Sequence, residues 1–201
     1  METDGALIER SVRGRPDAFV EVVQRHEVAV HAFLARRAGL DTAGDLLGEV
    51  WLRAFAARDG YDPARSDALP WLYGIARNVL REHRRAGPRA GFLPGPDAVD
   101  PWEDVDARLD LAPVAKAMLT AVRALPRAER DVLLLVAWEQ LTPAEAALVL
   151  GIPQGTARSR LHRARSSLRQ VLGNDVEQDP EQDGEEDRWP PRRHTMISRS
   201  R

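Results

Sequence analysis

Residues 141–165 carry the pattern of two helices joined by a tight turn, and this pattern constrains the fold more than any other segment. Thr142 and Glu145 have the spacing of a capping box, which marks the start of a helix. Gly151 permits the positive φ angle that ends a helix, and Pro153 prevents that helix from continuing. A new helix is therefore expected directly after the turn. The segment predicts a helix-turn-helix motif.

The second helix of this motif is expected to have one apolar face and one basic face. At about 100° per residue, the apolar face comprises Ala157, Leu161, Ala164 and Leu168. The opposite face and its flanks carry Arg158, Ser159, Arg160, His162, Arg163 and Arg165. Such a helix can read base edges with its exposed donors and hold phosphates with its flanking arginines. A helix whose arginines only keep it soluble is the alternative, and the capped helix before it favours DNA binding.

The rest of the chain also has helical spacing. Apolar residues recur at steps of three and four in three stretches before residue 86, beginning with Phe19, Val22 and Val23. A turn-rich loop at 58–67 separates the second stretch from the third. The spacing predicts an all-α protein with one small helical domain over 10–86 and another over 112–172.

A linker and a tail are predicted outside these domains. Residues 87–111 are rich in proline, glycine and acidic side chains, which predicts a flexible acidic linker. Residues 113–172 hold nine basic and four acidic side chains, so basic charge gathers in one compact segment. Residues 173–201 are acidic and then arginine-rich, without apolar periodicity, and are predicted to form a disordered tail. The tail either shields the basic segment or only keeps the chain soluble.

The composition disfavours several classes of function. The chain has no cysteine, which excludes disulfides, zinc fingers and thiol nucleophiles. Its five histidines lack metal-ligand spacing and no nucleotide-binding or nucleophile motif occurs, so we expect no metal, no cofactor and no enzymatic activity. The longest apolar run, Val132 to Trp138, is far shorter than the roughly 20 residues that span a bilayer. With its polar N-terminus, the chain is expected to be cytoplasmic, without membrane insertion.

Two blocks of sequence resemble the extracytoplasmic-function (ECF) class of bacterial RNA polymerase sigma factors, over about residues 10–172. The block that resembles sigma region 2 contains DLLGEVWLRAF at 45–55 and WLYGIARNVL at 71–80. The block that resembles region 4 contains ALPRAERDVLLL at 124–135 and GTARSRLHRAR at 155–165. Their order and spacing are more specific than a generic helix-turn-helix. Gly48, where the family usually has glutamine, and Ala157, where it usually has a β-branched residue, depart from the pattern.

The resemblance implies a subunit that binds core RNA polymerase and directs it to specific promoters for transcription initiation. The polar face of the second motif helix would read the −35 element, and region 2 would open and read the −10 element. The residues matched to the −10 role are Tyr61, Arg65, Tyr73, Arg77, Asn78, Arg81, Arg84 and Arg85. The two tyrosines are candidates for stacking on a flipped base. The residues matched to the clamp helices of the polymerase β′ subunit are Asp45, Leu46, Glu49, Leu52 and Arg53.

The same resemblance implies the β flap of the polymerase and an anti-sigma factor as further partners. A different class of protein is the alternative, namely an autonomous helix-turn-helix regulator that binds palindromic DNA as a dimer. Such a regulator would be a stable dimer that is indifferent to RNA polymerase. A measurement of size with and without the polymerase separates the two hypotheses.

Overall fold

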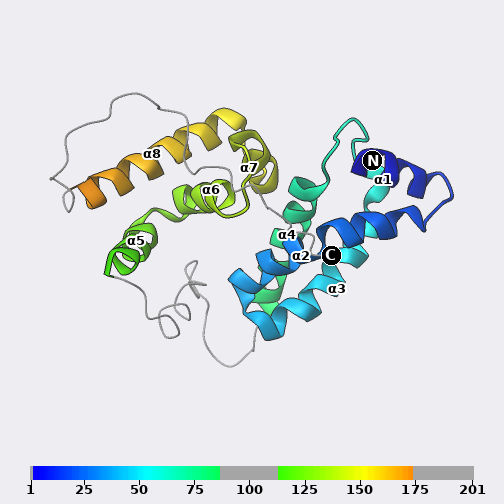
Figure 1. Ribbon diagram of the computed structural model, residues 1–201, viewed down its shortest axis with the longest axis horizontal. Helices are drawn as coiled ribbons and strands as arrows, with labels where there is room; N and C mark the ends of the chain where they lie inside the picture. The colour runs from blue at the N-terminus through cyan, green and yellow to red at the C-terminus, as the bar shows by residue number, and fades with distance from the viewer. Residues whose placement is uncertain (1, 87–112, 174–201) are drawn as a thin grey trace, which may run out of the picture. The chain divides into compact units, whose positions relative to one another are not determined.

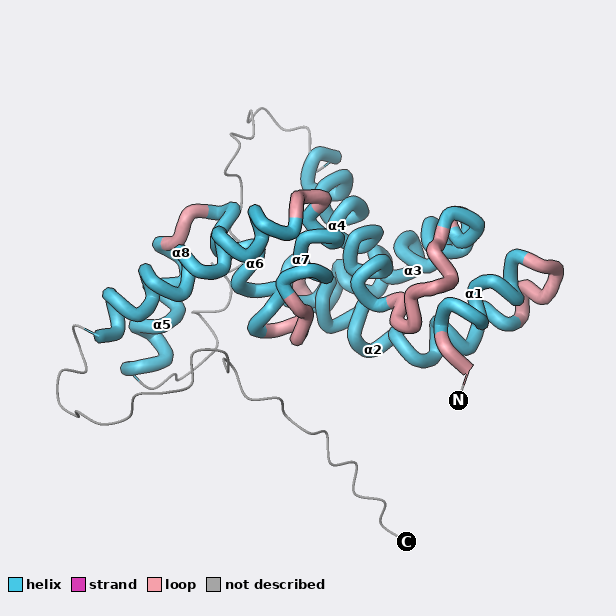
Figure 2. The backbone as a smooth tube through the Cα atoms, turned by 90° about the horizontal axis from the view of Figure 1, so that it is seen from above, coloured by secondary structure: helices cyan, strands magenta, loops and turns pink. Residues whose placement is uncertain are grey.

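The computed structural model describes residues 2–86 and 113–173. These two stretches contain α-helices and one short 3₁₀ helix, and no strand is found in either of them. The all-α prediction is therefore confirmed (Figure 1). The chain divides into two compact units, each of which is described separately. Figure 2 shows the helices of both units and the short loops that join them.

The first unit contains four α-helices arranged around a common apolar core. They are α1 (Asp4–Val12), α2 (Ala18–Ala38), α3 (Leu40–Ala56) and α4 (Leu69–Ala86), with the 3₁₀ helix η1 (Arg58–Gly60) between α3 and α4. Helix α2 packs against each of the other three α-helices. The side chains of Leu7, Val22, Phe33, Val50 and Leu72 are at most 1% exposed and form the centre of this core. The unit is thus held together by apolar faces that recur with helical spacing.

Two local features determine where these helices begin and end. The Thr3 hydroxyl accepts a hydrogen bond from the Ala6 amide at 3.3 Å and so caps α1. Gly39 has a φ of +81°, which ends α2 and lets α3 begin at the next residue. The first helix begins before the predicted domain start at residue 10, because Leu7 and Ile8 are buried in the core. With nine residues, α1 is too short to show a repeated apolar spacing.

The second unit contains α5 (Pro113–Ala124), α6 (Arg127–Ala137), residues 143–147 of α7 (Pro143–Leu150) and α8 (Gln154–Gly173). Helix α8 packs against both α5 and α6. The predicted linker, 87–111, lies outside the described residues, as does the predicted tail from residue 174 onward.

The predicted capping box and turn of the helix-turn-helix are confirmed. The Thr142 amide donates to the Glu145 carboxylate at 2.7 Å, and the Glu145 amide donates to the Thr142 hydroxyl at 3.2 Å. Gly151 has a φ of +67°, and α8 begins three residues later at Gln154. Helices α7 and α8 therefore form the motif that residues 141–165 predicted.

Candidate nucleic-acid interface

Helix α8 has the two faces that its sequence predicts. Ala157, Leu161 and Ala164 are at most 4% exposed, so the apolar face is buried within the second unit. Arg158, Ser159 and His162 are exposed on the other side, and Arg160 and Arg165 are half-buried on its flanks. The burial of one face fixes which side chains can meet a ligand, and those side chains are hydrogen-bond donors.

Arg163 is exposed but is held by an acidic partner on another helix. Its Nε donates to the Glu129 carboxylate of α6 at 2.7 Å. The Glu129 side chain is only 13% exposed, whereas that of Arg163 is 56% exposed. The contact joins the outer face of α8 to α6 and limits the directions in which the guanidinium can point.

A row of polar side chains follows the C-terminal half of α4. Asn78, Arg81 and Arg85 are exposed, and Arg77 is half-buried beside them. Their spacing of three and four residues places all four on one side of the helix. Arg84 has a different position, because its Nη2 donates to the Arg37 carbonyl oxygen of α2 at 3.0 Å. We therefore assign Arg84 to the packing of α4 on α2.

Tyr61 and Tyr73, the two candidates for stacking on a flipped base, are both buried in this structure. Tyr61 is 7% exposed and Tyr73 is 2% exposed, so neither ring has a free face. Tyr73 stacks on Phe33 with ring centroids 4.7 Å apart, and Tyr61 packs edge to face against Trp71 at 5.1 Å. Both rings are large enough to fill the space between helices, and burial there removes more apolar surface from water than a surface position would.

The Tyr61 hydroxyl stabilises the loop before α4 through hydrogen bonds to backbone carbonyl oxygens. It donates to the carbonyl oxygens of Arg65 and Asp67, at 3.2 and 3.1 Å. Burial, together with the nearby carboxylates of Asp4 and Asp67, raises the pKa of Tyr61 to about 12. The phenol therefore remains protonated and acts as a donor inside the loop that precedes α4.

Helix α3 presents an exposed surface that we call the α3 outer face, made of Asp45, Glu49 and Leu52. Leu52 is 70% exposed and Asp45 is exposed beside it. Leu46 was predicted to share this surface, but it is 7% exposed and belongs to the core. The error has a simple reason: Leu46 lies about 100° around the helix from Asp45 and so points inward with Val50.

Arg53 is engaged within the first unit. Its Nε contacts the Glu49 carboxylate and its Nη2 contacts the Glu82 carboxylate of α4, each at 2.6 Å. The hydrogen bonds that Arg53 donates to Glu82 and Glu49 raise the pKa of Arg53, and Arg53 in turn lowers the pKa of Glu82. All three side chains are substantially exposed, so the network orients charge on the surface more than it stabilises the fold.

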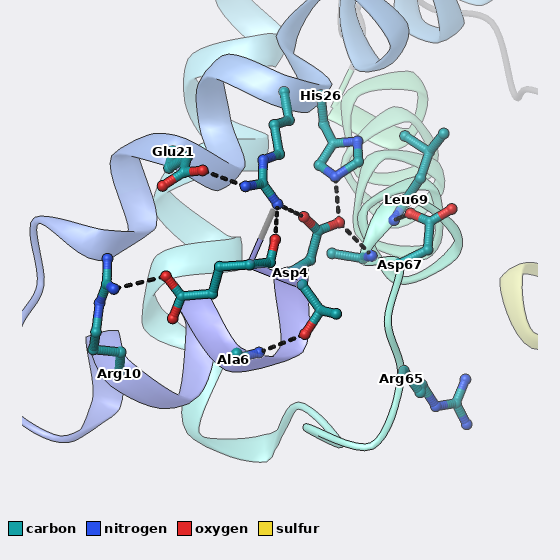
Figure 3. A network of polar contacts seen from close by, with 12 residues as sticks. Asp4, Ala6, Arg10, Glu21, His26, Arg65, Asp67 and Leu69 are labelled. Carbon is teal, nitrogen blue, oxygen red and sulfur yellow. Dashed lines mark hydrogen bonds and ion pairs between the residues drawn. The ribbon is translucent and has the colours of Figure 1, made fainter.

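Asp4, His26 and Asp67 offer oxygen and nitrogen atoms within 4.8 Å of one another, a grouping that could in principle hold a metal ion. The Asp4 carboxylate is already hydrogen bonded to Arg25 at 2.9 Å, to His26 at 2.6 Å and to the Ala68 amide at 3.0 Å (Figure 3). A guanidinium in contact with the carboxylate opposes a cation at the same place. We therefore interpret this cluster as a polar anchor and assign no metal to it.

Three acidic residues that shape these surfaces were not predicted from the sequence. Glu129 holds Arg163, Glu82 holds Arg53, and Asp4 holds the loop before α4. The spacing of four residues between Glu49 and Arg53 could have identified one local ion pair. No sequence signal marks the other contacts, because they join elements that are distant in the sequence.

In the described part of the chain, no helix is both long enough and apolar enough to cross a membrane.

Comparison with known proteins agrees with this architecture. Residues 22–89 match the family model for Sigma-70 region 2, and residues 115–168 match that for Sigma-70 region 4. The chain is 32% identical to the RNA polymerase sigma factor NccH of Alcaligenes xylosoxydans xylosoxydans, over 84% of this chain and 94% of that protein. It is 30% identical to the ECF RNA polymerase sigma factor RpoE of Cereibacter sphaeroides, over 85% of this chain and 96% of that protein.

A solved structure extends the likeness to three dimensions. The structure of CnrH in complex with the cytosolic domain of CnrY is 28% identical in sequence, with a TM-score of 0.59 over 86% of this chain and 98% of that chain. Region 2 precedes region 4 along the chain, and the two relatives are matched over 94% and 96% of their lengths. The chain therefore belongs to the ECF class of RNA polymerase sigma factors, which bind core RNA polymerase and promoter DNA.

Proposed function

We propose that α7 and α8 read the −35 element of the promoter as duplex DNA. The observation that carries this proposal is the exposed row of donors on α8, with Arg158, Ser159 and His162 turned away from a buried apolar face. A helix of this kind fits the major groove, where donors distinguish base pairs. Arg160 and Arg165 flank the row and are suited to phosphate contact.

The −10 element is assigned to the row on α4 and to the loop before it. Arg77, Asn78, Arg81 and Arg85 provide cationic and polar groups along one side of α4, and Arg65 is exposed on the loop. A basic track suits the backbone of a single strand. With the two tyrosines buried, we assign the recognition of an unstacked base to the loop and not to an aromatic platform.

The α3 outer face is assigned to the clamp helices of the polymerase β′ subunit. It combines an exposed leucine with two carboxylates, Asp45 and Glu49, on one side of a well-packed helix. Arg53 stands beside them in contact with Glu49. Apolar surface surrounded by charge is the composition of a specific protein interface.

Polymerase binding is tested with a double variant and a matched control. We expect Asp45→Ala with Leu52→Ala to lower affinity for core polymerase, without a change in the unfolding transition. The control is Glu27→Ala with Val28→Ala, which removes one acidic and one apolar side chain from exposed positions of α2. Equal affinity of the two double variants would contradict the assignment of the α3 outer face.

Promoter recognition is tested by measuring the binding of promoter DNA to the free chain and to the chain assembled with purified core polymerase. We expect the free chain to bind promoter DNA weakly and with strong dependence on salt, and to bind specifically only with the core enzyme. Nanomolar, promoter-specific binding by the chain alone, as a stable dimer, would instead support an autonomous regulator. In this proposal the chain acts in the cytoplasm, performs no chemical step itself and is held inactive by an anti-sigma factor when it is not required.

A further inference from the structure

Helix α1 is in direct contact with the loop at residues 61–68. The backbone amide of Asp4 donates to the Ser66 carbonyl oxygen at 3.2 Å. The Ala68 amide donates to the Asp4 carboxylate at 3.0 Å, in a buried hydrogen bond between residues 64 positions apart. Asp4, at the N-terminal end of α1, therefore binds the end of the loop through both its backbone and its side chain.

Gly5 allows this approach. A Cβ atom at Gly5 would lie 2.3 Å from the Pro63 carbonyl oxygen and 2.6 Å from that of Arg65. Both neighbours are backbone atoms and cannot rotate away. The backbone at Gly5 has an ordinary helical conformation, so a special φ angle does not explain the glycine. Glycine is required here because the loop passes too close to leave room for a Cβ atom.

The Asp4 carboxylate is in turn held in place by two residues of α2, Arg25 and His26. The side chains of Asp4 and Arg25 are 6% and 16% exposed, and the Arg25 Nη1 donates to the Asp4 carboxylate at 2.9 Å. The His26 Nε2 lies 2.6 Å from the second carboxylate oxygen of Asp4 (Figure 3). Hydrogen bonds in which one or both groups are charged are among the stronger ones in proteins.

The loop is ordered on its inner side and exposed on its outer side. On the inner side, the buried Tyr61 hydroxyl donates to the carbonyl oxygens of Arg65 and Asp67 and so connects the two ends of the loop. The side chains of residues 62–67 are exposed. The loop thus has a defined backbone and a row of accessible side chains.

We propose that Asp4 and Gly5 are positioning residues for the recognition of a single-stranded base by loop 61–68. This inference rests on the proposed function, in which that loop meets the −10 element. A loop that is already in its binding conformation loses less conformational entropy when a base enters. Because such a loop cannot re-pack around a base of another shape, it also rejects wrong bases more strictly than a flexible loop does. Helix α1 then acts on promoter selectivity without touching DNA.

The experiment measures sequence discrimination by the full chain assembled with core polymerase. The probe is a fork-junction DNA whose −10 element is single-stranded on the non-template strand, compared with a set in which each base of that element is changed in turn. The ratio of affinities for the best and the changed sequence does not depend on the fraction of active protein. A partly unfolded variant therefore cannot imitate the expected effect. Discrimination at the duplex −35 element is measured in parallel as an internal control.

We expect Asp4→Ala to lower discrimination at the −10 element by about fivefold to tenfold, the scale of one lost hydrogen bond. Gly5→Ala should act in the same direction. Asp4→Asn, which keeps an acceptor for the Ala68 amide, should restore most of the discrimination. Glu9→Ala is the matched control, because Glu9 lies on the same helix and pairs with Arg13 in an exposed contact. Discrimination at the −35 element should be unchanged in all four variants.

A loop-surface variant, Arg65→Ala with Ser66→Ala, distinguishes failure of this inference from failure of the proposed function. If that variant loses discrimination at the −10 element while Asp4→Ala and Gly5→Ala keep it, the loop reads DNA without help from α1 and the inference is overturned. If the loop-surface variant keeps full discrimination, the assignment of the loop to the −10 element is wrong, and the inference is overturned with it.

Discussion

The guanidinium of Arg163 on α8 donates from Nε to the carboxylate of Glu129 on α6 at 2.7 Å. Glu129 is mostly buried, so it acts as a fixed acceptor, while Arg163 remains more than half exposed. An arginine has five N–H donors, and one that is held through Nε can still present its Nη groups to a base edge. The contact therefore makes Arg163 an oriented side chain on the surface assigned to the −35 element.

Replacement of Arg163 tests whether it reads a base. We expect Arg163→Ala to reduce discrimination at one position of the −35 element by about 1–3 kcal/mol. Glu129→Gln should cause a smaller loss at the same position, because the neutral amide holds the guanidinium less firmly. The measurement is binding of the holoenzyme to promoters altered at single −35 positions. A loss that is uniform over all sequences would show that Arg163 contacts only phosphate.

The pH dependence of stability tests the Asp4 anchor. Burial alone would raise the pKa of Asp4, but the hydrogen bonds from Ala68, His26 and Arg25 outweigh burial and hold the pKa below its ordinary value of 3.8. A carboxyl group whose pKa is lowered by folding stabilises the native state above its ordinary pKa. That contribution is lost as the pH falls below 3.8 and through the native-state pKa.

Asp4→Asn is the variant for this measurement. We expect it to lower the free energy of unfolding by about 1.5–3 kcal/mol at about pH 5.5, the scale of a hydrogen bond to a charged group. The difference from the wild type should become smaller at about pH 2.5, below the ordinary pKa of 3.8, because protonation of the carboxyl group removes the charge that the variant lacks. Urea denaturation at the two pH values provides the comparison. A difference that grows as the pH falls would contradict the anchoring role of the carboxylate.

Glycines in α3 and α1 should respond to alanine in opposite ways. At Gly44 and Gly48 a Cβ would have no neighbour within 4 Å, and both lie inside α3. We expect each change to alanine to stabilise the protein by up to about 1 kcal/mol, because alanine loses less backbone entropy in a helix. Gly5→Ala should destabilise it, since its Cβ would meet two carbonyl oxygens. Equal responses in thermal unfolding at Gly5 and Gly44 would refute the close approach of the loop to α1.

The Tyr61 hydroxyl provides a test of the buried tyrosine. Tyr61→Phe should lower the free energy of unfolding by about 0.5–1.5 kcal/mol, because two loop carbonyl oxygens lose their donor. An absorbance titration of the phenols should lose a group that ionises at about pH 12, in agreement with the raised pKa of Tyr61. Loss of a group that ionises at the ordinary pKa would show that the Tyr61 ring is exposed in solution.

The sequence by itself determined the features that depend on neighbours along the chain. The Thr142–Glu145 capping box, the positive φ of Gly151 and the buried face of α8 were all predicted correctly. Each depends on residues within one or two helical turns, where the helix geometry fixes which side chains meet. The resemblance to sigma regions 2 and 4 depended on the same local patterns and on their order.

Only the tertiary structure decided which of the predicted site residues face solvent and which hold others in place. Leu46, Tyr61 and Tyr73 proved to be buried, although their residue types suit an interface equally well. The pairs Arg163–Glu129 and Ala68–Asp4 join residues 34 and 64 positions apart, on elements that meet only when the helices pack. Because burial and partner choice depend on the packing of several helices at once, no periodicity within one segment contains that information.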